Sequence, residues 1–352
     1  MARIAFLTND DPLQPRGGAA KIVERQVKML RDQGDEVRVF APLFDWPNLP
    51  IWRRLIRHVA DLGVYSHLCR EISEWRPEIL ISHNLTGCGF GTAHAIHASG
   101  VRWIHVLHDV QLFEPSGRLR NASRVTIWQK AVSFFRRRVF GHPDLVISPT
   151  AWLLQEHRRR GFFLSEPTEV LPNPAPLATI FPRFLHQPLR VLFVGRLQQD
   201  KGADVVASLI GRVPFSCVWL LVGEGPLISR FPQDEGVRRL GNLPHEVLLE
   251  QMKEADVLLV PSRIEENQPT VILEAASVGL PVIASCKPGI KETLQGRGYL
   301  IDVDRPELML SALASLSDPE IFSAQSEAMY KLASIHDPLV YAERFLTLVK
   351  SK

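Results

Sequence analysis

The chain contains two successive series of strand-like and helix-like segments, separated by a proline-rich stretch. In each series, short runs of Val, Ile, Leu and Phe alternate with longer runs whose apolar residues recur every three or four positions. Strands that alternate with helices pair in parallel, because each helix returns the chain to the same end of the sheet. The sequence therefore predicts an α/β protein with two doubly wound parallel sheets, and 352 residues suffice for two such domains.

The positions of these runs divide the chain. Strand-like runs of the first series lie near residues 3–9, 36–42, 77–84, 102–109 and 144–150. Those of the second lie near residues 190–197, 218–226, 237–243, 255–262, 280–286 and 298–304. The stretch LPNPAPLATIFPRFLHQP (171–188) has five prolines and no periodicity, which predicts a linker. We therefore expect domains at 1–175 and 176–336, and a C-terminal helix at 337–352 that crosses back to the first domain.

Cysteine usage and apolar runs narrow the class of protein. The four cysteines are scattered, so neither a zinc site nor a disulfide framework is indicated, and a reducing cytoplasm is the simplest compartment. The N-terminal residues do not resemble a signal peptide, and no run approaches the roughly 18 apolar residues of a membrane-spanning helix. We expect a cytoplasmic protein that folds throughout its length.

Basic residues gather in the first half, at residues 51–59, 134–140 and 157–163, among aromatic and branched side chains. In the first of these segments apolar residues recur at helical spacing, with arginines mostly on the other faces. That pattern, with Arg53, Arg54 and Arg57 mostly away from the apolar stripe, fits an interfacial helix at an anionic membrane, and equally a surface helix packed on its own domain. Nucleic acid is not expected as a partner, since the basic groups lack the density and motifs of such proteins.

Two glycine-containing loops join a strand to a helix. Gly17 and Gly18 lie between the first strand and the first helix, where backbone N–H groups and the helix N-terminus favour an anion such as phosphate. A tight turn that needs a positive φ is the alternative reading. In the second loop, GRLQQDKG (195–202), Arg196 and Lys201 are placed to neutralise a diphosphate at the edge of the sheet.

The segment ENQPTVILEA (266–275) places two carboxylates around the start of a helix. Asn267 is a candidate N-cap and Pro269 suits the first turn, so Glu266 would lie at the helix mouth. Glu274 would lie more than one turn inside, among apolar neighbours. An ionised carboxylate there requires hydrogen-bond donors, and both ribose hydroxyls and an arginine of the same domain would serve.

Two histidines stand at the end of a predicted strand in the sequence HVLHD (105–109). His105 and His108 point to opposite faces of a strand, which argues against a shared metal ion. His108 and Asp109 come at the carboxyl edge, where open α/β sheets bind ligands. A histidine satisfied by local hydrogen bonds is the alternative reading.

Eight short motifs in order resemble the retaining glycosyltransferases of family 4, which have the GT-B fold: two Rossmann-like domains that face a central cleft. They are Gly17-Gly18, His108-Asp109, Gly195-Arg196 with Lys201-Gly202, Gly223-Glu-Gly-Pro226, Leu240-Gly241, Glu266 with Glu274, Gly279-x-Pro-Val-Ile-Ala284 and Gly289-x-x-Glu292. The resemblance covers nearly the whole chain. It departs from the common pattern at Glu266-Asn-Gln-Pro269, where many members have Glu-Gly-Phe-Gly, and at Pro172-Asn-Pro174 in the linker.

The resemblance implies roles for individual residues, with the acceptor on the first domain and a nucleotide-diphosphate sugar on the second. The donor diphosphate would be bound by Gly17, Gly18, Arg196, Lys201, Thr270 and Val271. The donor sugar would be bound by His108, Glu266, Asn267 and Gln268, of which His108 and Glu266 would be catalytic. The nucleoside would be bound by Gly223, Leu240, Gly241, Asn242, Leu243 and Glu274. No metal or other cofactor is implied.

The implied function is retaining transfer of a hexose from a UDP- or GDP-sugar to a hydroxyl of a glycan or a lipid-linked acceptor. Surface polysaccharide or glycoconjugate synthesis would be its setting, with the basic first domain in peripheral contact with the inner face of an anionic membrane. Two other functions fit the same architecture. One is a nucleotide-sugar epimerase, and the other is a catalytically silent subunit that binds a partner.

Overall fold

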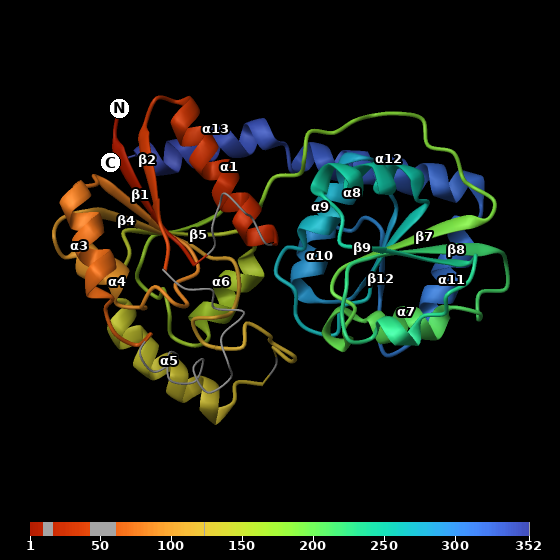
Figure 1. Ribbon diagram of the computed structural model, residues 1–352, viewed down its shortest axis with the longest axis horizontal. Coiled ribbons are helices and arrows are strands. Elements are labelled where there is room, and N and C mark those ends of the chain that lie inside the picture. The colour runs from red at the N-terminus through yellow and green to blue at the C-terminus, as the bar shows by residue number, and fades with distance from the viewer. Residues whose placement is uncertain (10–16, 43–60, 123, 352) are drawn as a thin grey trace. The chain divides into compact units, whose positions relative to one another are not determined.

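A computed structural model of the chain describes residues 1–9, 17–42, 61–122 and 124–351. The chain forms two compact units (Figure 1): the first comprises Met1–Pro172 and Ala342–Lys352, and the second comprises Asn173–Tyr341. The sequence analysis put the corresponding boundaries after residues 175 and 336. The return to the first unit takes place within the last helix, α13 (Pro338–Lys350).

The first unit is built on six parallel strands in the order β2-β1-β3-β4-β5-β6. The strands are β1 (Arg3–Leu7), β2 (Glu36–Phe40), β3 (Ile79–Ser82), β4 (Arg102–Val106), β5 (Leu145–Ser148) and β6 (Thr168–Val170). Its helices include α1 (Gly18–Asp32), α3 (Ser66–Trp75), α4 (Thr92–His97), α5 (Ile127–Phe140) and α6 (Ala151–Arg158). The three-residue β6 was not predicted, because it is too short to carry a periodic signal.

The second unit also contains six parallel strands, in the order β12-β11-β10-β7-β8-β9. The strands are β7 (Leu189–Val194), β8 (Cys217–Val222), β9 (Val237–Gly241), β10 (Val257–Val260), β11 (Val282–Ser285) and β12 (Tyr299–Ile301). The helical segments are η2 (Gln199–Lys201), α7 (Ala203–Leu209), η3 (Ile228–Arg230), α8 (His245–Glu254), α9 (Thr270–Ser277), α10 (Pro288–Leu294), α11 (Pro306–Leu316) and α12 (Pro319–Ile335). The predicted fold class, two doubly wound α/β domains, is confirmed.

Burial along the central strands explains why their sequences are continuously apolar. All four residues of β10 are buried: Leu258 and Val260 belong to one core cluster, Val257 and Leu259 to the other. Successive strand residues point to opposite faces of the sheet, and helices cover both faces. The second sheet therefore separates two apolar cores, and polar side chains are left to the ends of its strands.

The strand orders place a topological switch point in each sheet. In the second sheet β8 and β9 lie on one side of β7, whereas β10, β11 and β12 lie on the other. The loops that follow β7 and β10 therefore leave the sheet in opposite directions and open a crevice at the carboxyl ends of these two strands. In the first sheet the corresponding point lies between β1 and β3.

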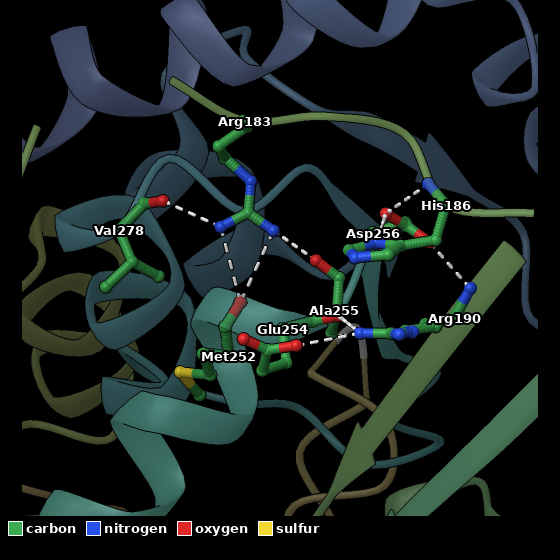
Figure 2. A network of polar contacts seen from close by, with 8 residues as sticks. All are labelled: Arg183, His186, Arg190, Met252, Glu254, Ala255, Asp256 and Val278. Atoms are coloured by element: carbon green, nitrogen blue, oxygen red, sulfur yellow. Dashed lines mark hydrogen bonds and ion pairs between the residues drawn. The ribbon is translucent and has the colours of Figure 1, made fainter. Parts of the chain in front are cut away.

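The predicted linker is a strap fastened to the second unit. Residues 171–188 have no regular secondary structure, yet their backbone and side chains bond to that unit at several points. Arg183 donates to the carbonyls of Met252 and Ala255 at the end of α8, and to that of Val278 after α9 (Figure 2). One guanidinium thus caps the C-termini of two helices, where backbone carbonyls lack helical partners.

A second contact of the strap lies nearby (Figure 2). The Nδ1 atom of His186 is 2.8 Å from Oδ1 of the buried Asp256, which also accepts from the backbone N–H of Arg190. Arg190 in turn reaches the exposed Glu254 with Nη1 at 2.8 Å from Oε2. The end of the strap and the start of β7 are therefore held by polar contacts with Asp256 and Glu254.

We expect Arg183→Met to lower the free energy of unfolding of the protein by about 2–3 kcal/mol, since charged hydrogen bonds to partly buried carbonyls are lost. Arg190→Met is the matched control, because among the described residues its side chain bonds only to the exposed Glu254, through the carboxylate and the carbonyl, and is worth about 1 kcal/mol or less. Urea unfolding of both variants, followed by circular dichroism, measures the difference. Equal destabilisation would show that Arg183 does not fasten the strap.

Candidate functional site

The candidate site of the second unit lies where β7 and β10 end. Lys201 follows β7, and Ser262 and Glu266 follow β10. The Nζ atom of Lys201 is 2.6 Å from Oε1 of Glu266, and Oγ of the buried Ser262 donates to the same oxygen at 2.8 Å. The crevice thus holds an ammonium and a carboxylate in direct contact, both only partly exposed.

Two glycines allow these loops to approach one another. Gly202 has a φ of 74°, and a Cβ atom there would lie 1.9 Å from the carbonyl oxygen of Pro261. At Gly289, in the first turn of α10, a Cβ would lie 2.1 Å from the carbonyl oxygens of both Glu266 and Asn267. Any larger residue would displace the backbone that carries Lys201 or Glu266. The sequence motifs Lys201-Gly202 and Gly289-x-x-Glu292 therefore set the position of the ion pair.

Helix α9 begins four residues after Glu266. Its N-cap is Pro269, not the predicted Asn267, and the side chain of Pro269 makes no capping hydrogen bond. Proline at this position has the extended backbone that an N-cap requires, with φ −63° and ψ 114°. The first turn, which includes Thr270 and Val271, consequently offers its N–H groups and the positive end of the helix dipole to an anion.

The side chain of Gln268 is hydrogen-bonded to the strap. This side chain is buried, and Oε1 accepts the backbone N–H of Asn173 in the strap at 2.7 Å. The side chain assigned to the donor sugar is therefore already bonded inside the unit. Asn267, beside it, is partly exposed.

Glu274 is buried on α9, one helical turn after Thr270. The Nδ1 atom of His245, the first residue of α8, lies 3.4 Å from Oε1 of Glu274. The sequence analysis expected ribose hydroxyls or an arginine beside this carboxylate, and the structure places a histidine there. His245 is partly exposed, so the pair lies at the surface of the unit.

The residues assigned to the nucleoside flank the ends of β8 and β9. The N–H of Gly223 donates to the carbonyl of Gly241 at 2.7 Å, which brings these two segments together. Asn242 is exposed, whereas Leu240 and Leu243 pack against the core beneath. Arg196, which follows β7, has an exposed side chain.

A second polar cluster lies at the carboxyl edge of the first sheet, where His83 follows β3 and His108 follows β4. The Nδ1 atom of His83 is 2.7 Å from Nε2 of His108, and the two rings are nearly parallel, with centroids 5.0 Å apart. The ring of His83 also stacks on that of Phe6 in β1, with centroids 5.6 Å apart. His83 is buried, and His108 is partly exposed.

The tautomers of this pair follow from its environment. A neutral imidazole has one N–H and one acceptor nitrogen. Within the described residues, Nε2 of the buried His83 has no hydrogen-bond partner. A buried N–H without an acceptor is rarer than an acceptor without a donor, so the proton of His83 lies on Nδ1 and is donated to Nε2 of His108. The proton of His108 then lies on Nδ1, and this nitrogen is a donor.

Burial keeps both rings neutral at pH 7. It lowers the pKa of His108 to about 4 and holds the pKa of His83 well below its ordinary value, with a further contribution from His108. A neutral His108 that donates from Nδ1 cannot act as a general base through that nitrogen. It can donate a hydrogen bond to a substrate oxygen.

Neighbouring residues fix the loops that carry His108. Asn84 donates to Oδ2 of Asp109 at 3.3 Å, and Oδ1 of Asp109 accepts the N–H of Gln111 at 2.8 Å. Gly17 is the N-cap of α1, with φ 110° and an exposed position, and Gly18 is the first residue of that helix. The positive φ of Gly17 agrees with the tight-turn reading, and the anion-binding reading remains a prediction.

The remaining predictions concern a basic helix at residues 51–59, a metal site and a membrane-spanning helix, and the structure describes only part of the chain. Residues 51–59, with Arg53, Arg54 and Arg57, lie outside the described residues. Within the described part of the chain, no three His, Cys, Asp or Glu side chains are grouped so as to hold a metal ion. No helix in the same part is long and apolar enough to cross a bilayer.

Comparison with known proteins agrees with this arrangement. Residues 16–179 match the family model described as Glycosyltransferase Family 4, and residues 188–318 match the one described as Glycosyl transferases group 1. By these two matches, the chain is a glycosyltransferase of the group 1 and family 4 type. The two matches fall on the first and second units respectively, so the resemblance seen in the sequence motifs is confirmed.

Curated relatives of this glycosyltransferase include bacterial proteins. An uncharacterized 42.6 kDa protein in the cps region of Klebsiella pneumoniae is 24% identical over 251 residues, which are 68% of this chain and 66% of that protein. The amylovoran biosynthesis glycosyltransferase AmsK of Erwinia amylovora is 31% identical over 153 residues, 39% of this chain and 38% of AmsK. The chain thus spans less than two thirds of the length of either relative.

Solved structures share the fold of this glycosyltransferase over its full length. Sucrose-phosphate synthase from Thermosynechococcus elongatus superposes with a TM-score of 0.77 at 17% identity, covering 99% of this chain and 98% of that one. HepE of Anabaena, in complex with UDP-glucose, superposes with a TM-score of 0.72 at 17% identity and covers 100% of both chains. At such identities the likeness concerns the fold, which is GT-B as predicted.

Three residues that contact the predicted site residues were not singled out from the sequence: His83, Ser262 and His245. His83 directly follows β3 and Ser262 is the second residue after β10, so a search for polar residues at strand ends would have found both. His245 begins α8 after Pro244, and nothing in its local sequence indicates a contact with Glu274.

Proposed function

We propose that this glycosyltransferase is a retaining enzyme that transfers a hexose from a UDP- or GDP-sugar to a hydroxyl of a glycan or lipid-linked acceptor. The second unit would bind the donor and the first unit the acceptor. The proposal depends chiefly on one observation, the Lys201–Glu266 pair with Ser262 at the switch point between β7 and β10. Ligands of open α/β sheets bind at this place.

The charges at this point suit the departure of a nucleoside diphosphate. Negative charge grows on the leaving phosphate as the glycosidic bond breaks, and Lys201, Arg196 and the N–H groups of Thr270 and Val271 would stabilise it. The ammonium of Lys201 has three donors, so it can contact a phosphate oxygen while it remains bonded to Glu266. The carboxylate thereby fixes the direction of the ammonium.

Glu266 would bind hydroxyls of the donor sugar, and its negative charge would favour the positive charge that develops at the anomeric carbon. In the retaining route that the family resemblance implies, the acceptor attacks from the side of the leaving group. A phosphate oxygen of the donor then takes the proton of the acceptor hydroxyl. His108 would donate from Nδ1 to an oxygen of the sugar, since its own basicity is low.

The nucleoside would lie along the ends of β8 and β9. Glu274 would accept hydrogen bonds from the ribose hydroxyls, with His245 at 3.4 Å holding its carboxylate in place. Gly223 and the segment from Leu240 to Leu243 would line the base, since the small Gly223 and Gly241 leave the backbone accessible. Asn267 and the backbone of Gln268 would complete the sugar site.

Two comparisons support the choice of donor and setting. HepE of Anabaena has been solved with UDP-glucose, and the relatives include AmsK of amylovoran biosynthesis and a putative colanic acid glycosyltransferase, WcaL. These names support a setting in surface polysaccharide synthesis. We further propose that the reaction takes place in the cytoplasm, with the enzyme in peripheral contact with the inner face of an anionic membrane.

A panel of nucleotide sugars tests the proposal. We expect one UDP- or GDP-sugar to raise the melting temperature, because a ligand stabilises the state it binds. Mass spectrometry should then detect a glycosylated acceptor, and a chelator should leave the rate unchanged if no metal takes part. Conversion of the donor sugar without any acceptor would indicate an epimerase. Donor binding without turnover of any acceptor would indicate a silent subunit.

A further inference from the structure

Helix α5, whose position in the first unit is seen in Figure 1, has an unusual distribution of side chains: it buries polar residues and exposes apolar ones. Three of the four residues that it buries are polar: Gln129, Ser133 and Arg136. Its large apolar residues instead face outward: Ile127 is 86% exposed, Trp128 64%, Phe135 57% and Phe134 43%. Surface helices of globular proteins normally bury such side chains.

The buried polar side of α5 is built into the unit. Gln129 donates to Oε2 of Glu114 at 3.0 Å, and the guanidinium of Arg136 donates to the carbonyl of Gln111. Arg136 also lies over the ring of Phe90, 4.3 Å from its centroid. The helix cannot rotate its apolar side inward without breaking these contacts, so the exposed apolar face is a fixed property of the fold.

The outward face is also positively charged. Helix α5 has four basic residues and no acidic one, and Lys130, Arg137 and Arg138 are exposed. The guanidinium of Arg138 lies 4.2 Å from the centroid of Phe134, whose ring contacts Phe135. Aromatic and cationic groups therefore share one surface, which we call the α5 face: Ile127, Trp128, Lys130, Phe134, Phe135 and Arg138.

A groove continues from the α5 face. It has a volume of about 550 Å³, and its lining includes Phe134, Arg137, Arg138, His142, Phe163 and Glu166. Among the described residues that line the groove, the one acidic group is Glu166, which lies 2.5 Å from Nδ1 of His142. Two arginines beside aromatic rings can hold the phosphate of a lipid headgroup while the rings contact the glycerol and upper acyl chain.

We propose that the α5 face and its groove are the surface with which this protein binds an acidic lipid bilayer. Exposed Trp and Phe side chains prefer the membrane interface, and Lys and Arg are attracted to acidic headgroups. A second copy of the chain is a poor occupant, since two α5 faces would bring like charges together. Nucleic acid is also a poor occupant, because the exposed apolar side chains of the α5 face would contact its charged backbone.

The proposal gives a residue-level basis to the membrane contact that accompanies the proposed function. The loop that α5 packs against, at Gln111, directly follows His108 and Asp109. A bilayer bound at α5 would present a lipid-linked acceptor to the same unit. Binding to vesicles is measured without donor or acceptor. A failure of the α5 surface to bind lipid would therefore not contradict the proposed sugar transfer, and a failure of sugar transfer would not contradict lipid binding.

Sedimentation with vesicles of phosphatidylcholine, alone or mixed with phosphatidylglycerol, tests the proposal on the full chain. The wild type is expected to bind the mixed vesicles and to bind the neutral ones at least tenfold more weakly. The double variant Trp128→Ser/Phe135→Ser should lose about tenfold in partitioning or more. The double variant Lys130→Glu/Arg138→Glu should bind the mixed vesicles more than tenfold more weakly than the wild type, since each positive charge removed should weaken binding by about fivefold.

Matched controls are available in the second unit. Ile321→Ser/Ile335→Ser removes two exposed apolar side chains from α12, and Arg305→Glu/Lys331→Glu makes the same charge change. Both should bind as the wild type does, and all variants should keep the melting temperature because the altered side chains are exposed. Equal binding by variants and controls would overturn the proposal. So would a dimer, seen by ultracentrifugation, that the α5 variants convert to a monomer.

Discussion

Glu266→Gln is expected to lower kcat by roughly 10²–10³-fold while the dissociation constant of the donor changes little. The amide keeps the shape of the side chain and can still bond to Ser262, but it has no negative charge to stabilise a developing positive charge at the sugar. It also breaks the 2.6 Å ion pair between Lys201 and Glu266, so the ammonium of Lys201 is no longer oriented toward the leaving phosphate. Steady-state kinetics and calorimetric titration of the donor separate the two effects.

Lys201→Ala is the complementary change in the same pair. It removes a cation that would contact the diphosphate, so we expect the donor to bind roughly 10–100-fold more weakly. Ser262→Ala is the matched control, since it removes one hydrogen bond to Glu266 and no charge, and should cost about tenfold or less. If Glu266→Gln and Lys201→Ala both leave kcat and donor affinity unchanged, these residues are not at the site.

His83→Phe should lower kcat by about tenfold or more, although His83 itself need not touch any substrate. The phenyl ring can still stack on Phe6, but it has no donor for Nε2 of His108. The proton of His108 is then free to move to Nε2, and Nδ1 would no longer donate. His83→Asn should restore most of the rate, because the amide nitrogen of asparagine occupies nearly the place of Nδ1.

The tautomer itself provides a readout that a merely structural role would not change. Nitrogen-15 shifts of His108, recorded without substrate, should report a proton on Nδ1 in the wild type and in His83→Asn, and on Nε2 in His83→Phe. A wild-type protein with the proton of His108 on Nε2 would contradict the assignment. The melting temperature of each variant shows whether the fold is retained.

The low pKa of His108 has a consequence for stability. Its pKa is about 4 in the folded protein, below the ordinary value of 6.5. Between these pH values the unfolded chain binds a proton that the folded chain does not, so the free energy of unfolding falls as the pH is lowered. The ring of His108 should accordingly show no titration between pH 8 and pH 5.

The order of strands and helices could be predicted from the sequence because it is a local signal. Apolar runs such as Val257–Val260 reveal buried strands without any knowledge of their neighbours. The alternation with helices implies a parallel sheet, and the carboxyl edge then places Lys201, Glu266 and His108 at ligand-binding ends of strands. The sequence by itself therefore determined the fold, and it predicted the carboxyl edge of each sheet as the place where ligands bind.

Only the tertiary structure decided which of these residues meet. Lys201 and Glu266 were given separate roles, yet they form one ion pair, because Gly202 lets the loops after β7 and β10 touch. His83 orients His108 across two strands, and no local pattern contains that contact. Partners brought together from distant parts of the chain depend on loop packing, which periodicity does not encode.

The same distinction holds away from the site. Composition predicted a linker at residues 171–188, but the bonds of Arg183 to three carbonyls depend on where α8 and α9 end. Helical spacing would turn the apolar side of α5 inward, yet Gln129 and Arg136 find buried partners and the apolar side faces out. Sequence periodicity indicates that a helix has two faces, and the partners available in the fold decide which one is buried.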